Sequence, residues 1–84
     1  MVEGQRFVYV LRSAAQPDRY YTGLTADVEN RLSAHNAGLS RHTASGRPWG
    51  LVVTVAFADA SRAAQFERYL KSGSGRAFAM HHFR

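Results

Sequence analysis

Two phenols, a guanidinium and an imidazole occur close together in the first half of the chain, and a carboxylate follows later. They belong to Tyr9, Tyr21, Arg31 and His35, and the carboxylate belongs to Glu67. Hydrolysis of a phosphodiester needs groups of these kinds: an acid or base to move a proton, a cation for the phosphate and an acidic ligand for a metal ion. The set therefore makes phosphodiester chemistry feasible.

Two short runs rich in aromatic and β-branched residues predict the strands that carry the tyrosines. They cover residues 7–11 and 20–25, and a turn between them makes a hairpin. Side chains alternate between the two faces of a strand, so Tyr21 and Gly23 share a face, and Tyr9 lies on one face of the first strand. We expect Gly23 to leave open space for a ligand beside Tyr21.

The segment after the second strand predicts a helix that presents a cation and an imidazole together. Thr25 is a plausible N-cap, and Gly38 can end the helix in a left-handed conformation. Arg31 and His35 are four residues apart, so they share one face of this helix, next to its apolar stripe.

The remaining elements complete an α+β fold. Residues 51–57 are almost wholly apolar, which predicts a strand at the centre of the sheet. Asp59 or Ser61 caps a second helix that carries Glu67, and residues 76–82 predict a short last helix. The order ββαβαα favours a small three-stranded, mostly antiparallel sheet flanked by helices.

The composition sets limits on the class of protein. The 84 residues predict a single domain, 1–84, without cysteine and so without a disulfide or thiolate metal site. No apolar run has the length of a membrane span and the N-terminus lacks a secretory pattern, so we expect a cytoplasmic protein with no membrane partner. Eleven basic against six acidic residues give a net charge of +5, which favours a polyanionic partner. Ten of the eleven are arginines, and many small domains are mildly basic without binding nucleic acid.

The order of these motifs resembles the GIY-YIG endonuclease superfamily, in particular its small stand-alone, single-domain members. The first signature triplet is degenerate and falls on Val8-Tyr9-Val10, and the second is Tyr21-Thr22-Gly23. The helix at residues 27–36 resembles the family helix with its arginine and histidine, and residues 66–71 resemble the helix with its glutamate. Each triplet alone is weakly specific, whereas their order and spacing together are specific.

The resemblance implies a role for each residue of the set. Glu67 would bind one Mg²⁺ or Mn²⁺ ion, and Arg31 would bind the scissile phosphate. Tyr9 would accept a proton from the attacking water, helped by His35 and Tyr21, if a nearby cation lowers its pKa. The simpler interpretation of Glu67 is an ion pair with Lys71 one helical turn away, worth only about 0.2 to 0.5 kcal/mol.

Other basic side chains are expected to contact the nucleic-acid backbone and to affect affinity more than rate. With Arg31, they are Arg41, His42, Arg47, Lys71 and Arg76. Trp49 is expected in the core rather than stacked on a base. The chain departs from the family pattern in two respects: it lacks the glycine and isoleucine of the first triplet, and it has no asparagine after Asn36, where many members carry one near the C-terminus.

The leading hypothesis is a metal-dependent endonuclease that hydrolyses DNA, on branched or damaged substrates in repair or recombination. A catalytically inactive nucleic-acid-binding module is the alternative, and a small protein-interaction domain is a third. RNA remains open as a substrate, and a protein partner or a homodimer remains open as the means of targeting.

Overall fold

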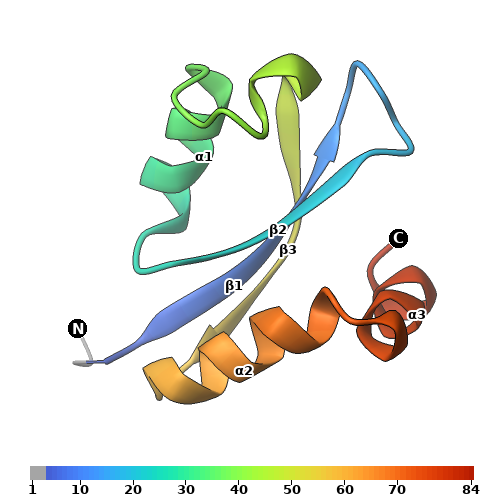
Figure 1. The fold of residues 1–84 in the computed structure, drawn as a ribbon. Helices are drawn as coiled ribbons and strands as arrows, with labels where there is room; N and C mark the ends of the chain where they lie inside the picture. Colours follow the sequence, from blue (N-terminus) through green and yellow to red (C-terminus); the bar gives the residue numbers. More distant parts are fainter. Residues whose placement is uncertain (1–3) are drawn as a thin grey trace.

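The predicted hairpin and helices form a three-stranded sheet with three helices in a computed structural model that describes residues 4–84 (Figure 1). The predicted domain 1–84 therefore includes three residues outside the described part of the chain. The elements follow the expected order ββαβαα, with a 3₁₀ turn at Ala44–Gly46. Their bounds are β1 Arg6–Ser13, β2 Tyr20–Thr25, α1 Val28–Asn36, β3 Trp49–Phe57, α2 Ala60–Leu70 and α3 Gly73–His82.

The sheet is antiparallel throughout, and its central strand is β1. The strand order is β2-β1-β3, so the expectation that residues 51–57 form the central strand is wrong. Although β3 is apolar, it lies at an edge, where Leu51 and Val52 are 46% and 38% exposed. Apolar composition alone does not distinguish a strand paired on both sides from an apolar edge strand.

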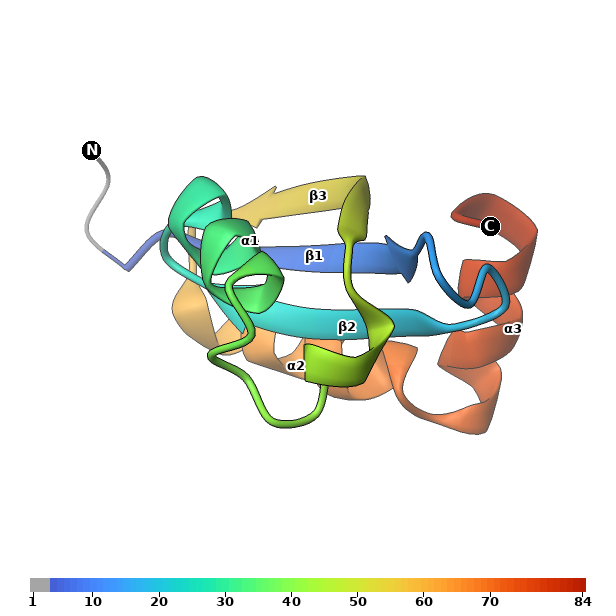
Figure 2. The same cartoon turned by 90° about the horizontal axis from the view of Figure 1, so that it is seen from above.

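Helices cover both faces of the sheet, and each face has its own core. Figures 1 and 2 show α1 on one side of the strands and α2 on the other, with α3 following α2. The core under α2 and α3 contains Val8, Val10, Ala63, Leu70 and Ala79. The core on the side of α1 contains Tyr9, Leu11 and Trp49, with Tyr21 and Leu32 packed against them. No helix among the described residues is long and apolar enough to cross a membrane.

The register of the hairpin places Tyr9 directly opposite Gly23, and Leu11 opposite Tyr21. The ring of Tyr9 lies so close to Gly23 that a β-carbon at that position would overlap it. The expected open space for a ligand is therefore filled by Tyr9. Gly23 instead accommodates the close approach of a side chain within the fold.

The first helix begins two residues later than its predicted cap implies. The Asp27 side chain accepts a hydrogen bond from the Asn30 amide at 3.0 Å and is the N-cap, so the prediction of Thr25 is wrong. Thr25 is the last residue of β2, and its hydroxyl accepts a hydrogen bond from the Asp27 amide. Gly38 follows the helix with φ +79°, as expected.

The two later helices are also capped by side chains. Asp59 caps α2 by accepting from the Ser61 amide at 2.8 Å, which confirms one of the two predicted caps. The last helix, α3, begins at Gly73, three residues before the predicted start. Ser72 caps it by accepting from the amide of Gly75 at 3.2 Å, so this serine–glycine stretch starts the helix.

Candidate active site

The structure brings both tyrosines of the hairpin into contact with the histidine of α1. The Tyr9 Oη and His35 Nε2 atoms are 2.8 Å apart, within hydrogen-bond distance. The Tyr21 and His35 rings meet edge to face with centroids 4.9 Å apart, and the two tyrosine rings are 6.3 Å apart. Strand pairing and helix packing thus form one cluster from residues up to 26 positions apart.

Arg31 adds a positive charge to this cluster from the same helix. Hydrogen bonding to Tyr9 raises the pKa of the Arg31 guanidinium, and the charge of Tyr21 adds to the effect. The residue is exposed, so its fork remains accessible to an anion from solvent. Arg31 and His35, four residues apart, therefore lie on one face of α1, as predicted.

His35 is fully buried, with both ring nitrogens occupied. Its Nδ1 atom lies 2.7 Å from the Thr43 hydroxyl, opposite the contact to Tyr9. Burial, and secondarily the charge of Arg31, lower the pKa of His35 below its ordinary value of 6.5. The imidazole is therefore neutral at pH 7, and a neutral ring has one donor and one acceptor nitrogen.

The Thr43 hydroxyl determines which nitrogen of His35 carries the proton. The other partner of this hydroxyl is the Ser40 carbonyl at 3.5 Å, and a carbonyl can only accept. When the hydroxyl donates there, it must accept from Nδ1 of His35. The Nε2 atom is then unprotonated and accepts the hydrogen bond of the Tyr9 hydroxyl.

Thr43 is a residue that sequence reasoning missed. It lies in the loop between α1 and β3, is fully buried, and its carbonyl accepts a hydrogen bond from the Trp49 indole at 2.7 Å. A threonine in a polar loop has no sequence signal that distinguishes it from its neighbours. The expected core role of Trp49 is confirmed, since the side chain is 4% exposed and supports this loop.

The pKa of the Tyr9 phenol is raised, contrary to the expected lowering. Burial is the largest cause, and it outweighs the hydrogen bond and charge of Arg31, which lower the pKa. The smaller influences of Tyr21 and Glu67 also raise it. Tyr9 is therefore a neutral phenol at pH 7, and it can take a proton from another group only while it gives its own to His35.

Glu67 projects from α2, and its carboxylate forms an ion pair with Lys71 one turn further along. The pairing is the one expected from the simpler interpretation, yet the negative charge also acts on Tyr9. The Glu67 side chain is 17% exposed. Among residues 4–84, no cluster of three or more acidic, histidine or cysteine side chains could hold a metal ion. A single carboxylate fits Mg²⁺, which keeps several waters and takes its other ligands from substrate phosphates.

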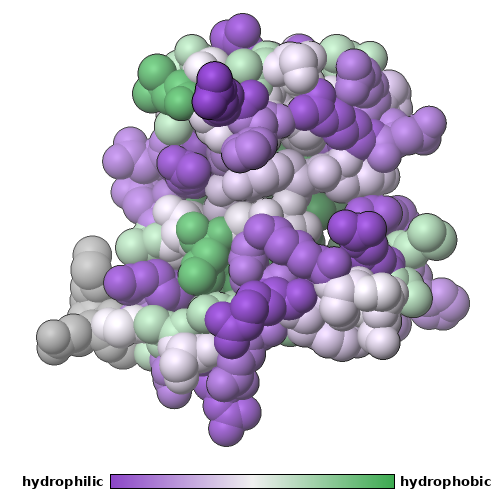
Figure 3. All heavy atoms as spheres, viewed as in Figure 1, coloured by the Kyte–Doolittle hydropathy of each residue, from purple (hydrophilic) through white to green (hydrophobic). Residues whose placement is uncertain are grey.

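The basic residues predicted to contact the nucleic-acid backbone divide into two groups. Lys71 and Arg76 line one groove with Tyr21, beside β2. Arg41, His42 and Arg47 lie in the loop before β3, where all three are exposed. None of these three residues lines the groove, although Arg19, which does line it, donates to the His42 carbonyl. Figure 3 shows hydrophilic side chains above and below a paler band that crosses the middle of this face of the molecule.

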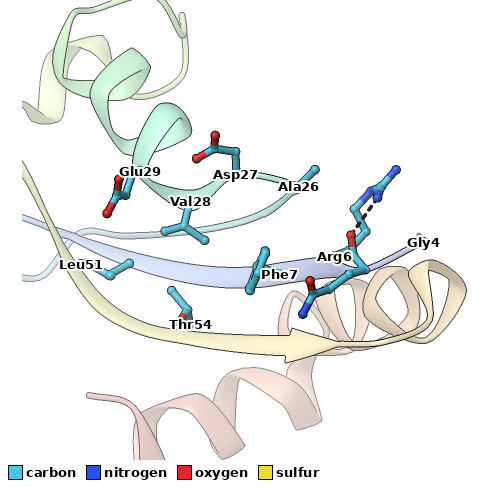
Figure 4. A pocket seen from close by; sticks show the side chains of 10 residues that line it. Gly4, Arg6, Phe7, Ala26, Asp27, Val28, Glu29, Leu51 and Thr54 are labelled. Atoms are coloured by element: carbon cyan, nitrogen blue, oxygen red, sulfur yellow. Dashed lines mark hydrogen bonds between the residues drawn. The ribbon is translucent and has the colours of Figure 1, made fainter. Parts of the chain in front are cut away.

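A large pocket lies elsewhere, at the N-terminal end of α1. Its volume is about 760 Å³, and Phe7, Val28 and Thr54 point into it (Figure 4). The carboxylates of Asp27 and Glu29 are part of its lining, whereas none of the predicted catalytic residues is. Arg6 is the one cation in the lining, so the two carboxylates leave the pocket with a net negative charge, which is unfavourable for phosphate.

The fold is a small α+β domain whose three-stranded antiparallel sheet carries a Tyr–His–Arg cluster on its hairpin and first helix. The family described as the GIY-YIG catalytic domain matches residues 5–80, and the chain belongs to this family. The resemblance seen in the sequence and the predicted fold class are thereby confirmed.

The chain is similar to small proteins that it covers over most of their length and to a larger protein that it covers only in part. A UPF0213 protein of Natronomonas pharaonis is 42% identical over 67 residues, which cover 79% of this chain and 76% of that protein. The solution NMR structure of a UPF0213 protein from Bacillus halodurans is similar with a TM-score of 0.55 and 29% identity, over 92% of this chain and 83% of that one. The structure-specific endonuclease subunit SLX1 of Candida dubliniensis is 39% identical over 71 residues. This match covers 76% of this chain but only 25% of the SLX1 protein.

Proposed function

We propose that the protein is a metal-dependent endonuclease that hydrolyses DNA phosphodiester bonds. The observation that carries this proposal is the buried hydrogen bond between Tyr9 and a neutral His35, with Arg31 exposed beside it. A neutral imidazole whose acceptor nitrogen faces a phenol can receive a proton through that phenol. This supports acid–base chemistry next to a phosphate-binding cation.

In the proposed reaction, Arg31 binds oxygens of the scissile phosphate and stabilises the charge that develops on them. Tyr9 takes a proton from the attacking water as its own proton moves to Nε2 of His35, so the phenol need never be ionised. Thr43 holds His35 in the tautomer that allows this transfer. Tyr21 forms one side of the cluster, where its hydroxyl orients water or phosphate.

The carboxylate of Glu67 would hold the metal ion, Mg²⁺ or Mn²⁺. When bound, the ion would supply a positive charge that stabilises the leaving oxygen. Lys71 pairs with one oxygen of this carboxylate, Oε2, and so competes with the ion for its negative charge.

The substrate is proposed to be branched or otherwise irregular DNA. The SLX1 relatives are named as subunits of a structure-specific endonuclease, and they are far longer than the part that this chain matches. A role in repair or recombination follows from that substrate class, and a protein partner or a second copy of the chain would supply targeting.

The alternative is a nucleic-acid-binding module without turnover, and one observation favours it: Glu67 is engaged by Lys71. The two functions are separated by cleavage of labelled linear, flapped, splayed and four-way DNA in Mg²⁺, Mn²⁺ or EDTA. We expect metal-dependent cleavage that is abolished in Glu67→Ala while DNA binding persists. Undiminished cleavage by Glu67→Ala would refute the assigned role, and binding without cleavage in any metal would favour the module.

A further inference from the structure

A basic groove lies beside the candidate active site, between β2 and the end of α2. It has a volume of about 530 Å³. Its lining includes four cations and two aromatic rings: Arg19, Lys71, Arg76, Arg84, Tyr20 and Tyr21. Asp18 is the one carboxylate among the lining residues, so the groove carries a net charge of 4 − 1 = +3.

The charges of this groove are largely left unneutralised. In the described part of the chain, the ion pair of Lys71 with Glu67 is the one salt bridge. Arg19 donates to the His42 carbonyl at 2.6 Å and to the Ser45 hydroxyl at 2.8 Å, and neither acceptor carries a charge. A concave surface with several unneutralised cations attracts polyanions.

Aromatic rings accompany the cations, and this combination suits an unpaired strand. The Arg84 guanidinium lies over the Tyr20 ring, 4.3 Å from its centre, and offers its own plane to a base in place of the ring face that it covers. Proteins that bind single-stranded DNA combine a basic groove that follows the phosphates with aromatic side chains on which bases stack. A duplex keeps its bases stacked on each other and cannot use the rings in this way.

The groove is continuous with the candidate active site through Tyr21. This residue lines the groove and also contacts His35, with ring centroids 4.9 Å apart. Lys71 forms a second connection, because it lines the groove and pairs with Glu67. A strand in the groove would therefore run directly to the groups proposed to cleave it.

We propose that this groove binds the phosphates of an unpaired DNA strand that leaves the scissile position, such as the single-stranded arm of a branched substrate. Arg76 and Arg84 contact the phosphates, and Lys71 exchanges its ion pair with Glu67 for a phosphate of the strand. The place of cleavage rests on the proposed function, whereas binding of the strand does not.

The test compares two arginines that carry the same charge on different sides of the molecule. Arg76 lines the groove, whereas Arg62 lies on α2 nine residues before Lys71, which is about 180° around the helix. Both are exposed, so Arg76→Ala and Arg62→Ala should fold equally well, which circular dichroism melting curves check.

Binding is measured by fluorescence anisotropy with labelled oligothymidylate and with a duplex of the same length, in EDTA and at several salt concentrations. We expect tighter binding of the single strand. Arg76→Ala should reduce the slope of log K against log salt by about 0.7 for each phosphate that is no longer neutralised. The double variant Arg76→Ala/Arg84→Ala should reduce it further, and Arg62→Ala should leave it unchanged.

Equal effects of Arg62→Ala and Arg76→Ala would overturn the proposal, because general attraction to net charge would then explain binding. Preference for the duplex would overturn it as well. These outcomes are independent of cleavage, which is measured separately on flapped DNA. A groove that binds a single strand in a protein that cleaves nothing would support this inference and count against the proposed function.

Discussion

The hydroxyl of Thr43 offers a sharp test of how the cluster is held. In Thr43→Val a methyl group replaces the hydroxyl at nearly the same size, so the 2.7 Å hydrogen bond with Nδ1 of His35 cannot form. The indole of Trp49 keeps its partner, because it bonds the backbone carbonyl of residue 43. The substitution therefore changes the histidine's hydrogen bonding with little change in packing.

The expected cost follows from burial at both ends of this hydrogen bond. Thr43 and His35 are both fully buried, so water cannot replace the missing partner. A buried polar group without a partner costs about 1 to 3 kcal/mol. We expect the free energy of unfolding to fall by that amount in urea titrations. Thr43→Ser keeps the hydroxyl and removes one methyl group, worth about 0.8 kcal/mol by area, and serves as the control.

A second readout separates the tautomer from general stability. Nitrogen NMR of labelled protein distinguishes the protonated from the unprotonated ring nitrogen, and we expect Nδ1–H in the wild type and in Thr43→Ser. Thr43→Val should lose this preference, and its cleavage rate should fall further than that of Thr43→Ser. An unchanged tautomer in Thr43→Val, or full stability without the hydroxyl, would refute the role assigned to Thr43.

The remaining predictions concern protons, space and metal affinity. Because the folded-state pKa of His35 lies below its unfolded value, the contribution of this residue to the free energy of unfolding is full above about pH 6.5 and declines as the pH falls. Urea unfolding at several pH values measures this decline, and an equally steep decline in His35→Gln would contradict the prediction. Gly23→Ala should destabilise the fold by about 1 to 3 kcal/mol in thermal or urea unfolding, since the new β-carbon overlaps the Tyr9 ring; wild-type stability would show that the ring moves at no cost. Lys71→Ala should tighten Mn²⁺ binding in the absence of DNA by at most about fivefold, measured by electron paramagnetic resonance, because Glu67 is freed from its competing cation; weaker binding would place the ion elsewhere.

Local patterns in the sequence were sufficient for the order of the elements and for several side-chain faces. Alternation along a strand placed Tyr9 and Tyr21 correctly, and the four-residue spacing placed Arg31 and His35 on one face of α1. Both periods are set by backbone geometry, which acts over a few residues and is visible in sequence. The cap at Asp59 and the glycine after α1 belong to the same class of local signal.

Tertiary structure decided what depends on contacts between distant segments. Strand order placed β1 rather than β3 at the centre, and the balance of burial against the charge of Arg31 set the direction of the Tyr9 pKa. The partner of His35 at Thr43 comes from a loop, and the basic groove joins Arg19 to Arg76 across the fold. The sequence by itself determined which groups are available and on which local face each lies. Packing decided which of them meet and how far water is excluded from them, because desolvation and hydrogen bonding are properties of the assembled core.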